Sequence, residues 1–325
     1  MTLKIGIRVA NYKEAGSGHI NRCKAIRKFL KAEVVWFLDR GSKSLANEFL
    51  HDCIVLEKSN RSASNLIVYL EKKGLDLVLV DSYMIGNQLF NKINLLTNTC
   101  ILLDSFSKKT SSEIAICPHP LPFHKNNKTI VGSKFSPINI SELIKTNISV
   151  KKKKILISMG TYDKNNITLK IVKVLKKLYK DNKITLKTII TLGNNSPSIR
   201  SIEETLINHK NNFSMLIGKK NLSKYYNESL FAIGAPGLAF TERMYLGVPS
   251  ILIAQNSYHK NLIKEWVTRN CAISSNNNKT SIENSILNIY DNKTLRNSLI
   301  KNGKKIVDGK GAERIAKCLI KLIHK

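Results

Sequence analysis

Short runs of aliphatic and β-branched residues alternate along this chain with longer segments that have the period of a helix. Strands this apolar belong in a parallel sheet that is covered on both faces, and the alternation is typical of βαβ units. In the first half the predicted strands are residues 3–9, 34–38, 53–56, 75–80 and 100–103, with helices beginning near His19, Ser42, Ser62 and Gly86. The pattern predicts the α/β class.

The segment 118–154 interrupts this pattern and predicts a domain boundary. It carries four of the seven prolines and a run of four lysines at 151–154. After it the strand candidates resume at 155–159, 184–191, 213–217, 230–233 and 250–253, with helices near 167, 199, 238 and 261. A chain of 325 residues is long enough for two cores. We therefore predict two Rossmann-like domains, 1–148 and 149–325, with mostly parallel sheets facing across a cleft.

The formal charge of +30 raises the question of nucleic-acid binding. Only 10 of the 53 basic residues are Arg, and the lysines are scattered, often beside one of 34 asparagines. Proteins that recognise nucleic-acid phosphates and bases favour Arg for these contacts. We therefore expect no specific nucleic-acid partner, and interpret the lysine excess as coding bias. The alternative is a basic surface that attracts anionic substrates or makes a peripheral contact with anionic lipid.

Cysteine spacing and hydropathy point to an intracellular protein. The six cysteines form no CxxC pair and lie at no zinc-finger spacing, so we interpret them as reduced thiols. The apolar runs are far shorter than the roughly 18 residues that cross a bilayer. The chain starts directly with a strand pattern instead of a leader, which predicts a cytoplasmic protein.

A glycine-containing loop follows the first predicted strand and leads into a helix. Gly16, Ser17 and Gly18 let the backbone approach a ligand, and the helix start favours an anion. The third glycine of a dinucleotide fingerprint and the GK[ST] end of a P-loop are missing. His19 stands in the first turn, where an imidazole can take a proton from water. The alternative is a histidine that only caps the helix or holds phosphate.

A second glycine motif follows the strand predicted at 230–233. Ala235, Pro236, Gly237 and Leu238 open a helix whose amides can hold a diphosphate, and Glu242 on that helix can accept hydrogen bonds from a ribose. The alternative is an ordinary turn followed by a solvated glutamate.

Other polar residues also follow predicted strands. Gly160, Asp163 and Asn165 come after the strand at 155–159, and Asp81 and Tyr83 come after the strand at 75–80. Asp104 follows the strand at 100–103. An aspartate in such a place can orient a sugar hydroxyl or a histidine, or it can merely cap the next helix.

Taken in order, these motifs resemble a known family. They occupy residues 16–22, 81–83, 159–165, 237–242 with 247–249, and 308–314. The whole chain resembles the UDP-2,4-diacetamido-2,4,6-trideoxy-β-L-altropyranose hydrolases of pseudaminic acid biosynthesis. Those enzymes are similar in turn to the peptidoglycan N-acetylglucosaminyltransferase, which has two Rossmann-like domains in the GT-B arrangement.

The resemblance implies hydrolysis of a UDP-sugar to UDP and a free sugar for surface glycans such as those on flagellin, without a metal or a cofactor. It makes His19 the group that activates water, places the diphosphate at 235–238 and the ribose at Glu242, and gives the sugar to the first domain and UDP to the second. Arg22 and Asn256 join the implied substrate-binding residues. We expect a monomer.

Four positions depart from the family's usual pattern. They are Ala10-Asn11 in place of an acidic residue, Asp104-Ser105 in place of paired aspartates, Pro137-Ile138-Asn139 in place of an arginine, and Asn256-Ser257 in place of Asn-Gln. Two alternatives therefore stay open: a GT-B glycosyltransferase that uses a UDP-sugar donor, and a module that binds a nucleotide-sugar or nucleic acid without turnover.

Overall fold

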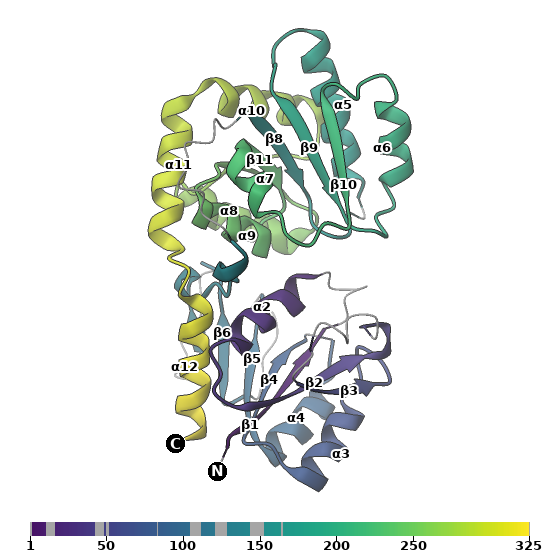
Figure 1. Ribbon diagram of the computed structural model, residues 1–325. Coiled ribbons are helices and arrows are strands. Elements are labelled where there is room, and N and C mark those ends of the chain that lie inside the picture. Colours follow the sequence, from purple (N-terminus) through teal and green to yellow (C-terminus); the bar gives the residue numbers. More distant parts are fainter. Residues whose placement is uncertain are drawn as a thin grey trace. The chain divides into compact units, whose positions relative to one another are not determined.

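The computed structural model describes residues 2–10, 17–42, 49, 52–82, 84–104, 112–120, 129–143, 153–163 and 165–324. The chain divides into two compact units (Figure 1). The first unit is Met1–Asn139 with Gly309–Lys325, and the second is Ile140–Asp308. Each unit is built on one sheet, and every strand pair in the described residues is parallel. The α/β class with two Rossmann-like sheets is confirmed.

The sheet of the first unit has the strand order β3-β2-β1-β4-β5-β6-β7. Its strands are β1 (Lys4–Val9), β2 (Glu33–Asp39), β3 (Cys53–Glu57), β4 (Leu77–Asp81), β5 (Asn98–Leu102), β6 (Ile114–Cys117) and β7 (Thr129–Val131). The order reverses between β1 and β4. Parallel sheets usually bind their ligands at the carboxyl ends of the strands at such a reversal. Asp81, the last residue of β4, lies at this point.

Helices cover both faces of the first sheet, as Figure 1 shows. They are α2 (Ser17–Arg27), α3 (Ser64–Lys73), α4 (Asn87–Leu96) and α12 (Gly311–Ile323), with a 3-10 turn η2 at Ser133–Phe135. Successive strand residues point to opposite faces. Accordingly, Trp36 packs in the core shared with α2 and α12, whereas Phe37 packs in the core shared with α3 and α4.

The second unit repeats the plan with the order β10-β9-β8-β11-β12-β13. Its strands are β8 (Lys154–Ser158), β9 (Lys187–Leu192), β10 (Phe213–Ile217), β11 (Ser229–Gly234), β12 (Ser250–Ile253) and β13 (Ile273–Ser275). Its helices are η3 (Ile140–Glu142), α5 (Ile167–Lys180), α6 (Ile199–Leu206), α7 (Ser223–Glu228), α8 (Leu238–Leu246), α9 (Ser257–Thr268), α10 (Lys279–Asp291) and α11 (Lys293–Ile306). Here the order reverses between β8 and β11, so the loops after these strands are the expected place for a ligand.

The structure adds elements that the apolar pattern did not predict. Strands β6, β7 and β13 have only three or four residues. The helix expected near Ser42 begins at the edge of a stretch, 43–48, that lies outside the described residues. No helix in the described part of the chain is long and apolar enough to span a bilayer.

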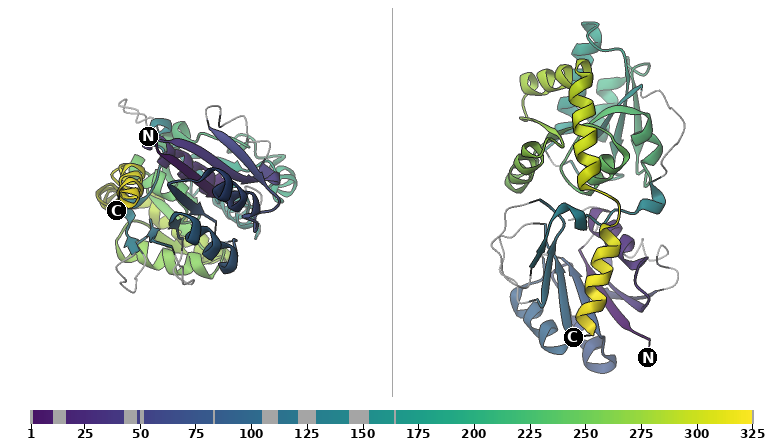
Figure 2. Two further views of the ribbon diagram at one scale, coloured as in Figure 1. Left: turned by 90° about the horizontal axis from the view of Figure 1, so that it is seen from below. Right: turned by 90° about the vertical axis from the view of Figure 1, so that its left-hand side faces the viewer.

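The compact units differ from the predicted domains at two places. The division falls after Asn139, where the predicted boundary was residue 148, and the last helix belongs to the first unit, where the prediction gave it to the second. Figure 2 follows the chain from α11 into α12, which runs along the first sheet. The cause is packing: Ile315 and Leu319 of α12 lie in the same core as α2.

The motif at 308–314 fixes the start of α12. A Cβ atom on Gly311 would lie 2.1 Å from the carbonyl oxygen of Ser136, so only glycine allows this approach. Arg314 Nη1 donates to the carbonyl oxygen of Lys134 at 2.9 Å. The motif therefore anchors the helix on the η2 region.

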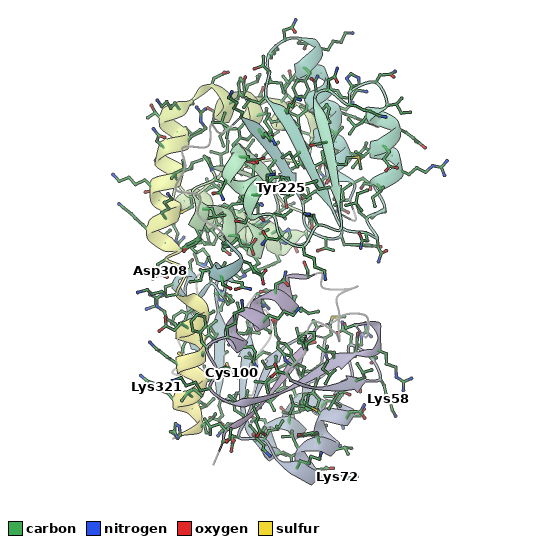
Figure 3. The ribbon with its side chains drawn as sticks, viewed as in Figure 1. Lys58, Lys72, Cys100, Tyr225, Asp308 and Lys321 are labelled. Atoms are coloured by element: carbon green, nitrogen blue, oxygen red, sulfur yellow. The ribbon has the colours of Figure 1, made fainter. Side chains whose placement is uncertain are left out.

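This packing predicts that α12 stabilises the first unit. Leu319 is 1 % exposed, whereas Lys321 of the same helix is exposed and points away from the sheet (Figure 3). We expect Leu319→Ala to lower the free energy of unfolding of the first unit by about 2–5 kcal/mol through the cavity it leaves. Lys321→Ala should change it by less than about 0.5 kcal/mol.

The two tryptophans make the measurement specific, because Trp36 lies in the first unit and Trp266 in the second. Both variants are made in a Trp266→Phe background, and urea unfolding is followed by the fluorescence of Trp36. Equal transitions for the two variants would contradict the assignment of α12 to the first unit.

Candidate active site

His19 and Asp81 form a buried pair at the switch point of the first sheet. His19 lies in the first turn of α2 and is 6 % exposed, and Asp81 ends β4 and is fully buried. His19 Nδ1 lies 2.7 Å from Asp81 Oδ1. An ionised carboxylate can only accept, so Nδ1 carries the proton in this contact. The other ring nitrogen, Nε2, is then the one that can accept a proton.

Arg22 binds Asp81 with two hydrogen bonds from the same face of α2. Its Nε donates to Asp81 Oδ2 at 2.6 Å, and its Nη2 donates to Oδ1. Its Nη1 donates to Oδ1 of Asp104, which follows β5. Residues three apart on a helix are neighbours, so His19 and Arg22 both reach the end of β4. The guanidinium thus joins the ends of two adjacent strands.

The charges keep both carboxylates ionised. Burial would raise the pKa of Asp81, but Arg22 and His19 outweigh it and hold the pKa below the ordinary 3.8. Burial opposes ionisation of Asp104 as well, yet Arg22 and the two nearby histidines hold its pKa well below 3.8. Asp81 is therefore an anion at neutral pH and keeps the Nδ1 proton of His19 in place.

Asp104 connects this pair to a second histidine and to solvent. His119 Nε2 lies 3.4 Å from Asp104 Oδ1, and His19 Nε2 lies 3.6 Å from Asp104 Oδ2. The Asp104 side chain is 24 % exposed, more than its neighbours. Cys23 Sγ also donates to Asp81 Oδ2 at 3.2 Å, and burial raises its pKa well above 9.0. We name His19, Arg22, Asp81, Asp104 and His119 the His19 cluster.

Sequence reasoning proposed His19, Arg22 and Asp81 and weighed Asp104, but it missed His119. The available signal was its position just after a strand, β6, whose run of four residues was too short to predict. Ser17 and Gly18 begin α2. Gly16 and Tyr83 lie outside the described residues. In the part of the chain that the structure describes, no group of three or more His, Cys, Asp or Glu side chains is arranged to hold a metal ion.

In the second unit, the turn after β11 approaches the end of β8 closely. A Cβ atom on Gly234 would lie 2.4 Å from the carbonyl oxygen of Ser158, so glycine is required there. Ala235 and Pro236 follow, and Gly237 is the N-cap of α8, without a side-chain hydrogen bond. The amide of Leu238 therefore belongs to a helix start that is open to an anion.

Glu242 lies on α8 in an environment that favours its neutral form. The hydroxyl of Tyr226, from α7, donates to Glu242 Oε2 at 3.1 Å. Burial, with a smaller effect of Glu142, raises the pKa of Glu242 from 4.5 to about 7, although Tyr226 and Arg243 lower it. Near neutral pH this side chain can accept hydrogen bonds as a carboxylate or donate one as an acid.

The loops after β8 and β12 lie on either side of β11 and contact each other. Asn165 Nδ2 donates to the carbonyl oxygen of Gln255 at 2.9 Å, and Gln255 Nε2 donates to the carbonyl oxygen of Met159 at 2.7 Å. Gly160 adopts a positive φ of 96° in this loop. Gln255 was not among the predicted residues, since the adjacent Asn256 carried the motif.

Two of the predicted binding residues accept hydrogen bonds from the first backbone amides of a helix. Asp163 accepts from the amides of Ile167 at 3.1 Å and Thr168 at 2.6 Å at the start of α5. Asn256 Oδ1 accepts from the amide of His259 at 2.8 Å at the start of α9. Both side chains therefore cap a helix in this structure.

The second unit of the chain resembles a known protein family. Residues 139–306, just over half of the chain, match the family described as glycosyl transferases group 1. The chain belongs to this family. The match covers η3 to α11, which is almost the whole second unit and includes the turn after β11.

Some similar proteins match the chain over almost its full length. The spore coat polysaccharide biosynthesis protein SpsG of Bacillus subtilis is 21 % identical over 339 residues, which cover 98 % of both chains. Among solved structures, Staphylococcus aureus MnaA, a co-structure with UDP, has a TM-score of 0.72 at 14 % identity and covers 99 % of this chain and 98 % of its own. Acinetobacter baumannii MurG has a TM-score of 0.68 at 13 % identity, with 98 % and 99 % covered. These structures share the fold, and the GT-B class is confirmed.

The raised pKa of Glu242 predicts how the stability of the second unit depends on pH. A folded-state pKa of about 7 against an ordinary 4.5 means that the folded chain binds this proton more tightly. The resulting stabilisation is complete below pH 4.5 and is lost as the pH rises through about 7. We expect the free energy of unfolding to fall by about 1–3 kcal/mol between pH of about 5 and 8.5 from this group.

The test follows urea unfolding by Trp266 fluorescence in a Trp36→Phe background. Glu242→Gln should remove this component of the pH dependence, whereas Glu204→Gln, an exposed residue of the same unit, should leave it intact. An unchanged pH profile in Glu242→Gln would refute the assignment.

Proposed function

We propose that this protein is a nucleotide-sugar hydrolase that cleaves the bond between the anomeric carbon and the diphosphate oxygen of a UDP-linked sugar. The observation that supports this most strongly is the pair His19–Asp81, a base held by a carboxylate at the switch point of the first sheet. A base that a third group orients is the usual arrangement for activating a weak nucleophile such as water.

In the proposed reaction His19 Nε2 takes a proton from water while the water oxygen forms a bond to the anomeric carbon. The bond from that carbon to the diphosphate oxygen breaks, and its electron pair leaves with UDP. The imidazolium that results is stabilised by Asp81 at Nδ1, 2.7 Å away, and by Asp104, 3.6 Å from Nε2. The partly exposed Asp104 gives this proton a route to solvent.

The second unit is proposed to hold UDP. A diphosphate leaving group is a weak base, so the main requirement is to stabilise its charge while the bond breaks. The uncapped start of α8 at Gly237 and Leu238 is suited to this, and Glu242 is suited to accept from the ribose. The UDP in the MnaA co-structure, which shares the fold, supports the choice of nucleotide.

The proposed sugar is a 2,4-diacetamido-2,4,6-trideoxy hexose on the path to pseudaminic acid. The motif resemblance supports it, and the match to SpsG, a protein of spore coat polysaccharide biosynthesis, supports a role in making surface polysaccharides. The His19 cluster is compatible with a sugar that carries polar substituents, because it is rich in charged side chains.

A glycosyltransferase is the second candidate, and the family match favours it. In that case His19 would deprotonate an acceptor hydroxyl instead of water, with the same cleavage of the donor bond. The excess of lysines would then favour an acceptor on anionic lipid.

The deciding experiment incubates the protein with the UDP-linked diacetamido sugar in H₂¹⁸O and measures UDP release and the label in the free sugar. We expect label at the anomeric hydroxyl without any acceptor. His19→Asn should reduce UDP release by about 10²- to 10⁴-fold because the base is lost. His324→Asn, at an exposed histidine, is the matched control and should be unaffected.

Release of UDP only when an acceptor is added would select the transferase. Binding of the nucleotide-sugar without any product, with His19→Asn indistinguishable from wild type, would select a binding module. Affinity for DNA or RNA that falls steeply with salt would point to the nucleic-acid form of that module.

A further inference from the structure

Arg243, on α8, is a buried cation that the proposed reaction does not yet use. Its side chain is fully buried and runs back toward the start of its own helix, as long helical side chains do. Nε donates to Ser250 Oγ at 3.0 Å, and Nη2 donates to the carbonyl oxygen of Ala235 at 3.3 Å. Nη1 is buried and has no hydrogen-bond partner among the described residues.

The charge of Arg243 is also poorly balanced. No ion pair to Arg243 is found within the described residues, and burial lowers its pKa, although Tyr226 and Glu242 raise it. Glu242 is a weak counter-charge near neutral pH, because its own pKa is about 7. The ring of Phe240, whose centroid lies 5.6 Å from Arg243 Cζ, supplies only a cation–π contact. A buried charge without an ionised partner is unfavourable, so its persistence calls for a compensating anion.

The guanidinium lies against the turn that opens α8. A Cβ atom on Gly234 would lie 3.0 Å from both Nη1 and Nη2, which places the cation directly at the backbone of this turn. The helix start there, at Gly237, has no side-chain cap and carries a partial positive charge of its own. Two positive features at one turn repel each other unless an anion binds there.

We propose that Arg243 is the counter-charge that makes the turn at Gly234–Leu238 selective for a diphosphate over a monophosphate. It is a positioning residue that acts through the backbone. By holding the Ala235 carbonyl oxygen it turns an acceptor away from the ligand, so that amides face the anion. Its own charge adds an attraction that grows with the charge of the ligand. The identity of the nucleotide, UDP, rests on the proposed function. The preference for two phosphates over one does not.

The experiment measures affinities of the full chain for UDP, UMP and inorganic pyrophosphate by calorimetry. We compare Arg243→Gln, which keeps hydrogen-bond donors but loses the charge, with Arg243→Lys, which keeps the charge. In Arg243→Gln we expect the affinities for UDP and pyrophosphate to fall about tenfold or more and that for UMP by less than about threefold. Arg243→Lys should keep most of the discrimination, and Arg269→Gln, an exposed arginine of the same unit, all of it.

An unchanged ratio of UDP to UMP affinity in folded Arg243→Gln would overturn the proposal, as would equal loss in Arg243→Lys. If wild type binds pyrophosphate but not UDP, the nucleotide of the proposed function fails while Arg243 is still tested. The wild-type chain gives a test without any variant: pyrophosphate should raise the Tm of the transition reported by Trp266, and orthophosphate much less. No shift with pyrophosphate would also overturn the proposal.

Discussion

The bidentate hold of Arg22 on Asp81, with its third contact to Asp104, is the interaction on which the chemistry of the first unit depends. A carboxyl group as buried as Asp81 would otherwise take up a proton, and a neutral acid would no longer fix the tautomer of His19. A single guanidinium therefore sets two protonation states at once. Its placement follows from α2 beginning directly beside the end of β4, so the electrostatics are a consequence of the strand order.

The sequence predicted those strands of the fold that are continuous apolar runs. The strands at 3–9, 34–38 and 75–80 stand out because buried parallel strands are apolar on both faces. Short strands at or next to a sheet edge, such as β6, β7 and β13, bury too few residues to give such a pattern. The position of α12 could not be predicted from the sequence for another reason. The sequence of an amphipathic helix shows that one face is apolar, but not which sheet that face packs against.

The site was predicted as separate residues and not as a cluster. His19 and Asp81 were recognised from their places at a helix start and a strand end, and Arg22 through the motif resemblance. The contact between residues 19 and 81 depends on strand order, which no local pattern reveals. Asp163 and Asn256 illustrate the converse limit. Side chains that accept from ligands also accept from helix amides, so the same motif supports both roles until the hydrogen bonds are seen.

The return of α12 to the first sheet has a consequence for biosynthesis. A ribosome releases every residue of the second unit, up to Asp308, before it releases the helix that completes the core of the first. The later-encoded sheet can therefore finish folding while the earlier one still exposes the apolar strip that awaits Ile315 and Leu319. Nascent chains of this protein are then most vulnerable to association through their amino-terminal half, in the interval before the last residues emerge.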